Sequence, residues 1–100
     1  MELIKENAIK EWRNFIGPIN VDKAKKESPQ SLRAIFGNGG KNTVHGSDSE
    51  ASVKREYALV FNKIRNEPSL TNCSCLVIKP HAIKEGNAGK IIDIILTERF

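Results

Sequence analysis

Hydrophobic residues recur at helical spacing in three stretches of the chain. These stretches are residues 6–16, a segment that begins just after His45, and the region that follows Pro80. Gly17 and Pro18 are typical of a helix stop and should end the first stretch. The expected buried faces are, in chain order, Ala8, Trp12, Phe15 and Ile16; Val53, Tyr57, Val60, Phe61 and Ile64; and Ala88, Ile91, Ile92, Ile95 and Leu96.

Residues 73–79 have the β-branched and apolar character of a buried strand. Cys73 and Cys75 are two positions apart and therefore share one face of that strand. A zinc site with His45 or His81 is an alternative, but no second ligand pair stands at a recognisable spacing. We therefore expect buried, reduced thiols, which fits a cytosolic compartment.

Two polar regions connect these elements. Residues 18–41 predict a loop that is interrupted by one short helix, with Ser28 as its cap and Pro29 at its first position. A turn at residues 38–40 follows, without the spacing of a phosphate-cradling loop. Residues 62–72 are typical of a connection between two units.

Composition limits the classes of protein to which the chain can belong. Its 100 residues suffice for at most one modest domain, and 39% hydrophobic with 28% charged content is typical of a globular protein. No apolar run is long enough for a membrane span or a signal peptide, so we expect a cytoplasmic protein without a membrane partner. The net charge of +4 is spread along the chain, which favours a solvated surface with a few phosphate ligands over nucleic-acid binding.

Residues 42–50 combine an imidazole with the start of a helix. Ser47 and Glu50 fit a capping box, with Ser47 or Ser49 as the cap, and Gly46 leaves room for a phosphate at the helix N-terminus. A histidine that attacks phosphorus needs its second ring nitrogen held by an acceptor, and Glu56 is placed to reach back to His45. On these features alone, a surface or capping histidine is the more common interpretation.

A longer pattern changes that balance. The segments Arg33-Ala34-Ile35-Phe36-Gly37 and Asn42-x-x-His45-Gly46-Ser47-Asp48-Ser49, followed by Glu56, closely resemble the active-site segment of nucleoside diphosphate kinases. The resemblance implies that a nucleoside triphosphate such as ATP, with Mg²⁺, phosphorylates His45, which then donates to a nucleoside diphosphate. It also implies an α+β (α/β) fold with a ferredoxin-like antiparallel sheet, here incomplete.

The same resemblance assigns roles to further residues. Arg13 and Arg33 are expected to bind phosphates, Asn42 to help hold the nucleotide, Lys79 of a Lys-Pro segment to neutralise charge, and Glu56 with Ser47 to orient His45. For Arg33 the alternative is a surface ion pair. Two positions depart from the family pattern: the usual threonine shortly after Gly17 is missing, and His81 replaces an aspartate.

The order of the motifs is reversed relative to a complete kinase domain, because the Lys-Pro segment follows the histidine. We therefore expect residues 1–62 to end a first kinase domain, residues 63–71 to be a linker and residues 72–100 to begin a second domain. On this hypothesis Met1 and Phe100 are internal positions of a longer protein. Each piece would lack strand partners, which predicts a poorly stable chain.

Two hypotheses about function follow from the resemblance. The first is a nucleoside diphosphate kinase that acts through His45. The second is a structural component of cilia, centrosomes or the cytoskeleton that uses the kinase fold as a packing module and binds tubulin or axonemal proteins. Retention of His45, Arg33, Asn42 and Glu56 favours the first.

Overall fold

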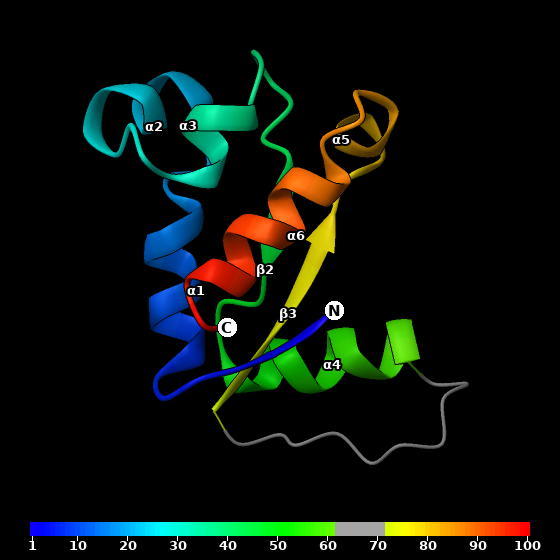
Figure 1. The fold of residues 1–100 in the computed structure, drawn as a ribbon. Coiled ribbons are helices and arrows are strands. Elements are labelled where there is room, and N and C mark those ends of the chain that lie inside the picture. The colour runs from blue at the N-terminus through cyan, green and yellow to red at the C-terminus, as the bar shows by residue number, and fades with distance from the viewer. Residues whose placement is uncertain (62–71) are drawn as a thin grey trace.

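The computed structural model describes residues 1–61 and 72–100 (Figure 1). The element order is β1 Glu2–Ile4, α1 Ala8–Ile16, α2 Val21–Glu27, α3 Leu32–Phe36, β2 Val44–Gly46, α4 Glu50–Phe61, β3 Cys73–Ile78, α5 Pro80–Lys84 and α6 Ala88–Thr97. This mixture of helices with a small antiparallel sheet agrees with the expected α+β class.

The sheet has the strand order β1-β3-β2, and both pairings are antiparallel. Leu3 lies opposite Ser74, and His45 lies opposite Val77. The expectation that each piece of the chain lacks strand partners is therefore wrong. The six-residue strand β3 offers hydrogen-bonding groups on both of its edges, and it uses them to join two three-residue strands that are not paired with each other.

Helices cover both faces of this sheet. Leu76 and Leu3 point to the face where Trp12 of α1 and Ile91 and Ile95 of α6 form the core. By strand alternation Cys73 and Cys75 face the other side, where α4 packs against β3. In Figure 1, β3 runs through the middle of the molecule, and α4 crosses near its N-terminal end.

Helix α1 confirms the predicted apolar face, since Ala8, Trp12 and Ile16 are buried. It begins later than expected because Asn7 has a φ of 53°, which lies outside the helical region. It ends at Gly17, as predicted. Gly17 has a φ of 80°, and a Cβ there would lie 2.4 Å from Ser31 Oγ, so this stop requires glycine for two reasons.

The region between α1 and β2 differs from its prediction. It contains two helices, and Ser28 with Pro29 starts neither of them. Asn20 Oδ1 caps α2 by accepting from Lys23 N–H at 2.9 Å, and Ser31 Oγ caps α3. Ser28 instead closes α2, because its N–H donates to Ala24 O at 2.8 Å. The predicted turn at residues 38–40 is confirmed by the reciprocal backbone bonds between Asn38 and Lys41, each 3.0 Å.

Two predicted apolar stripes are only partly buried. In α4, Val53 is buried but Val60 is 54% exposed, so its prediction as a core residue is wrong. In the last segment, Ile91 and Ile95 are buried while Leu96 is 57% exposed. That segment is also divided into two helices, α5 and α6. In both stripes the helix meets the sheet along a narrower face than the spacing suggested.

Part of the sequence analysis concerns residues that the structure does not describe. The predicted linker at residues 63–71 and the core position Ile64 lie outside the described residues. Within residues 1–61 and 72–100, no helix has the length and apolar character needed to cross a membrane.

Candidate active site

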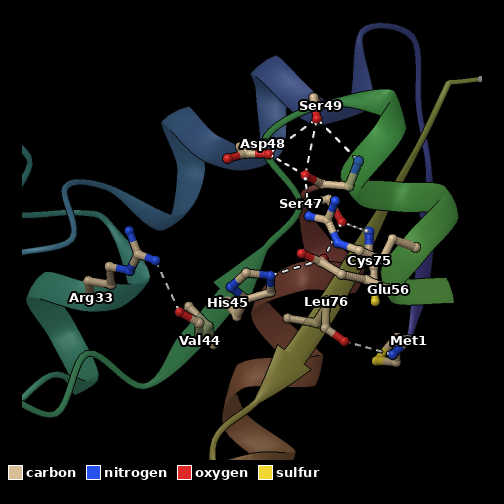
Figure 2. A network of polar contacts seen from close by, with 12 residues as sticks. Met1, Arg33, Val44, His45, Ser47, Asp48, Ser49, Glu56, Cys75 and Leu76 are labelled. Carbon is tan, nitrogen blue, oxygen red and sulfur yellow. Dashed lines mark hydrogen bonds and ion pairs between the residues drawn. The ribbon is translucent and has the colours of Figure 1, made fainter. Parts of the chain in front are cut away.

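His45 lies in β2 with its ring directed at α4. Its Nε2 atom is 3.0 Å from Glu56 Oε2, and the side chain is 43% exposed (Figure 2). The partner carboxylate is 23% exposed. The contact predicted from sequence between His45 and Glu56 is therefore present, in a position that solvent and a ligand can reach.

Ser47 contacts the same carboxylate oxygen as His45. Its hydroxyl donates to Glu56 Oε2 at 2.7 Å and accepts from the backbone N–H of Cys75 at 3.3 Å (Figure 2). Ser47 N–H in turn donates to Cys75 O at 3.3 Å. Because Ser47 is fully buried and bonded to β3, it orients Glu56 and does not cap the helix.

The hydrogen bonds assign the histidine tautomer. A carboxylate accepts hydrogen bonds, so Nε2 carries the proton that it shares with Glu56, and the lone pair of the neutral ring is on Nδ1. In the described part of the chain no hydrogen bond engages Nδ1. A ring in this state can attack an electrophile through Nδ1, while Glu56 stabilises the positive charge that develops.

The helix that carries Glu56 begins with a separate network. Ser49 Oγ accepts from Ser52 N–H at 3.2 Å and is the cap, one of the two residues predicted for it. Ser52 Oγ donates to Asp48 Oδ1 at 2.6 Å, and Ser49 Oγ donates to the same oxygen at 3.3 Å. These hydroxyls lower the pKa of Asp48, chiefly through Ser52. Asp48 precedes the helix and belongs to its cap.

Arg13 lies on the exposed side of α1 and borders two cavities. One cavity of about 500 Å³ is lined by Arg13, Arg33, Gly17 and Ser28, among others. The second, of about 450 Å³, is lined by Arg13 and Asp48 together with neighbouring residues. The guanidinium of Arg13 is thus accessible to an anion from solvent.

Arg33 is placed differently from Arg13. It is only 7% exposed, and its Nη1 donates to Gly17 O at 2.7 Å. Its Nη2 donates to Val44 O at 3.2 Å, a contact that Figure 2 shows. Burial and the nearby charge of Arg13 lower its pKa. The alternative of a surface ion pair is wrong, since the side chain is buried and its partners are backbone carbonyls.

Lys79 and Asn42 meet, although 37 positions separate them along the chain. Lys79 Nζ donates to Asn42 Oδ1, and Asn42 Nδ2 donates to Ile19 O at 3.2 Å. Lys79 N–H also donates to Thr43 O at 2.8 Å. The pairing of β3 with β2 therefore brings the lysine of the Lys-Pro segment beside the strand that carries His45.

The remaining candidates are the two cysteines and His81. Both cysteines are buried as expected, and burial raises the pKa of each thiol, so they stay protonated at neutral pH. Within residues 1–61 and 72–100, no three His, Cys, Asp or Glu side chains gather as a metal site would require. His81, which stands where the family has an aspartate, lies in α5 and is partly buried.

Sequence analysis missed Thr43 as a residue of this site. Thr43 is fully buried and has a φ of 71°, a value that β-branched residues rarely adopt. Nothing in the local pattern signals such a conformation, because neither glycine nor asparagine occupies the position.

Comparison with known proteins identifies the family. Residues 1–65 match the family described as nucleoside diphosphate kinase. This match covers more than half of the chain, so the protein belongs to the nucleoside diphosphate kinase family.

Individual relatives agree with this assignment. Nucleoside diphosphate kinase homolog 7 of Rattus norvegicus is 45% identical over 98 residues, which cover 92% of this chain and 25% of the relative. Probable nucleoside diphosphate kinase 5 of Arabidopsis thaliana is 48% identical over 65 residues, or 64% of this chain and 45% of the relative. A nucleoside diphosphate kinase of Aquifex aeolicus is 45% identical over 58 residues, or 57% of this chain and 41% of the relative. The chain thus spans about a quarter of the length of the rat relative.

Proposed function

We propose that this protein transfers the terminal phosphate of a nucleoside triphosphate to a nucleoside diphosphate through a phosphohistidine at His45. The observation that carries this proposal is the chain of contacts from Ser47 through Glu56 to His45 Nε2, which leaves Nδ1 as the nucleophile. Family membership supports the same reaction class.

The proposed reaction has two half-reactions of the same kind. The Nδ1 lone pair attacks the γ-phosphorus, an N–P bond forms, and the bond from phosphorus to the bridging oxygen breaks to release a nucleoside diphosphate. The ring then carries a positive charge, which the Glu56 carboxylate stabilises at Nε2. A second nucleoside diphosphate attacks the phosphorus with a terminal oxygen of its β-phosphate, and the electron pair of the N–P bond returns to His45.

Charge on the transferred group needs cations in place before the reaction. Arg13 and Lys79 are the accessible candidates, and Asn42 holds the lysine at the end of β2. We propose that Mg²⁺ enters with the phosphates of the nucleotide, where it neutralises their charge. Arg13 and Lys79 give this part of the site a basic character, and the described residues contain no acidic cluster. Both features favour a metal ion held by the substrate over one held by the protein.

We also propose that residues 1–62 and 72–100 derive from successive kinase units, joined by residues 63–71. The family match ends at residue 65, next to the expected boundary, while the alignment with the rat relative continues over 92% of the chain. Both observations support this division. The packing of β3 between β1 and β2 then makes one sheet from parts of two units.

Transfer of label from ATP tests the proposed function. The chain is incubated with γ-labelled ATP and Mg²⁺, beside His45→Ala, and label that is labile in acid but stable in alkali is measured. We expect such label on the unaltered chain and none on the variant. A folded chain that takes no label would contradict the enzymatic proposal and favour the structural alternative, in which tubulin or axonemal proteins are the partners.

A further inference from the structure

We propose that Trp12 is a positioning residue, whose indole ring sets the position of β2 and thereby that of the proposed nucleophile, His45. This inference rests on the proposed function, because it specifies how a residue outside the site contributes to the reaction. The apolar pattern of the sequence predicts only that Trp12 is buried in the core.

The indole lies directly against the backbone of Gly46, the residue between His45 and Ser47. A Cβ at Gly46 would lie 2.1 Å from Trp12 Nε1 and 2.2 Å from Trp12 Cδ1, whereas the next nearest atom is 3.5 Å away. The φ of Gly46 lies outside the left-handed region, so it is a value that other residues adopt. The indole, and not the backbone conformation, therefore requires glycine at this position.

Packing alone holds the indole in place. Trp12 is 0% exposed, and among the residues that the structure describes its Nε1 has no hydrogen-bond partner. A buried indole N–H ordinarily finds an acceptor, and leaving it without one costs free energy. The ring instead contacts two other aromatic rings, with centroid distances of 6.0 Å to Phe15 and 5.6 Å to Phe100, the latter in an edge-on arrangement. The indole is thus a rigid support against Gly46.

The position of Gly46 determines that of its two neighbours. By strand alternation Gly46 faces α1, whereas His45 and Ser47 face α4. Both neighbours contact one oxygen, Glu56 Oε2, at 3.0 and 2.7 Å, so a movement of β2 away from α4 lengthens both contacts. A displacement of about 1 Å in a reacting group can lower the rate about 100-fold. Close packing of Trp12 against Gly46 prevents that movement.

Matched truncations separate positioning from general stability. Trp12→Leu removes Nε1 and leaves a smaller, flexible side chain, and Ile95→Ala, at a fully buried position of α6, is the control. Rates are expressed per folded molecule, with the folded fraction taken from urea denaturation. We expect Trp12→Leu to lower kcat at least about tenfold with KM for the nucleotide within about twofold, because orientation is lost and binding is kept.

The control decides the interpretation of this result. Ile95→Ala should keep kcat within about twofold, because its cavity lies away from β2. Equal kcat values for the two variants, or a raised KM with unchanged kcat in Trp12→Leu, would overturn the proposal. If Trp12→Leu does not fold, Trp12→Phe takes its place, since it keeps an aromatic ring and still removes Nε1. A loss in kcat of about threefold is expected there, and no loss would overturn the proposal.

A double-mutant cycle tests the contact between the indole and β2. Gly46→Ala places a methyl group where the indole lies, so β2 must move, and Trp12→Leu makes room for that methyl group. We expect Gly46→Ala to lower kcat about tenfold or more in the unaltered chain but less than about threefold in the Trp12→Leu background. Equal factors in the two backgrounds would overturn the proposed role of the contact.

Amide hydrogen exchange gives a readout that does not depend on activity. Cys75 N–H donates to Ser47 Oγ at 3.3 Å on the β2 side of β3, whereas Leu76 N–H donates to Met1 O at 2.9 Å on the β1 side. We expect Trp12→Leu to accelerate exchange at Cys75 at least about fivefold more than at Leu76. Equal acceleration at both amides would overturn the proposed support of β2.

The two kinds of readout also distinguish this inference from the proposed function. If the unaltered chain takes no phosphate at His45, the proposed function fails, and Trp12 has no reaction to support. The exchange experiment still tests whether Trp12 holds β2 in that case.

Discussion

The two sides of the candidate site are built in opposite ways. The nucleophile side, named for the proposed nucleophile His45, also contains Ser47 and Glu56. It comes from 12 consecutive residues and is joined by two side-chain contacts of 3.0 and 2.7 Å. The cationic side comes from α1, α3, the loop before β2 and the residue after β3. A site of this kind can therefore retain its nucleophile while its electrostatics depend on the whole fold.

The largest expected effect comes from the nucleophile side. Glu56→Gln keeps the shape of the side chain but removes the charge that stabilises the imidazolium, so the rate of phosphotransfer should fall about 10³-fold. Initial rates with saturating ATP and nucleoside diphosphate measure this. Glu27→Gln, an exposed residue of α2, is the control and should keep the parental rate. A Glu56→Gln rate near that of the control would contradict the assigned role.

Lys79 provides the corresponding test of the cationic side. If Lys79, which follows β3, stabilises charge on the transferred phosphate, Lys79→Met should lower the transfer rate about 10²-fold, because one preorganised cation is lost. Lys84→Met, on the exposed part of α5, should have little effect. The same rate assay compares the two variants. Equal rates for both would mean that the cationic side works without β3.

The position of β2, which carries His45, also depends on its close packing against α1. A Cβ at Gly46 would lie 2.1 Å from Trp12 Nε1, so Gly46→Ala should lower the free energy of unfolding by about 1–3 kcal/mol through overpacking. Urea denaturation measures this. Gly40→Ala, where a Cβ meets nothing within 4 Å, is the matched control and should keep the parental midpoint. Equal midpoints for the two variants would show that β2 can move away from α1.

Asp48 should give the smallest effect, and its sign follows from the lowered pKa. A carboxyl group whose pKa is lowered by folding adds stability above its unfolded pKa, about 3.9, and loses that contribution as the pH falls through the folded value. The difference in melting temperature between the parent and Asp48→Asn should therefore shrink as the pH falls from about 5 to about 2. A difference that grew over this interval would reverse the sign.

Sequence analysis predicted the parts of the site that local spacing determines. A helix that starts near Ser49 and carries Glu56 two turns later brings the carboxylate back to His45, so this contact follows from the helical repeat. The stop at Gly17 follows from the same kind of local rule, since few other residues tolerate its φ of 80°. Both predictions depend on a few neighbouring residues.

The remaining features required the tertiary structure. Arg33 is a charged residue whose inward orientation depends on carbonyls of Gly17 and Val44, which lie 16 and 11 positions away. The insertion of β3 between β1 and β2 contradicts the expectation that each piece would lack strand partners. The positive φ of Thr43 is imposed on a residue that does not favour it. In each case distant partners override local preference.

The site of phosphorylation tests the central claim most directly. Protein that contains ¹⁵N-labelled histidine is phosphorylated with ATP and Mg²⁺. The ring nitrogen bonded to phosphorus is then identified by nitrogen and phosphorus NMR under alkaline conditions. The hydrogen bond between Nε2 and Glu56 predicts that the N–P bond forms at Nδ1 of His45. A bond at Nε2, or phosphate on His81, would contradict the account of the site.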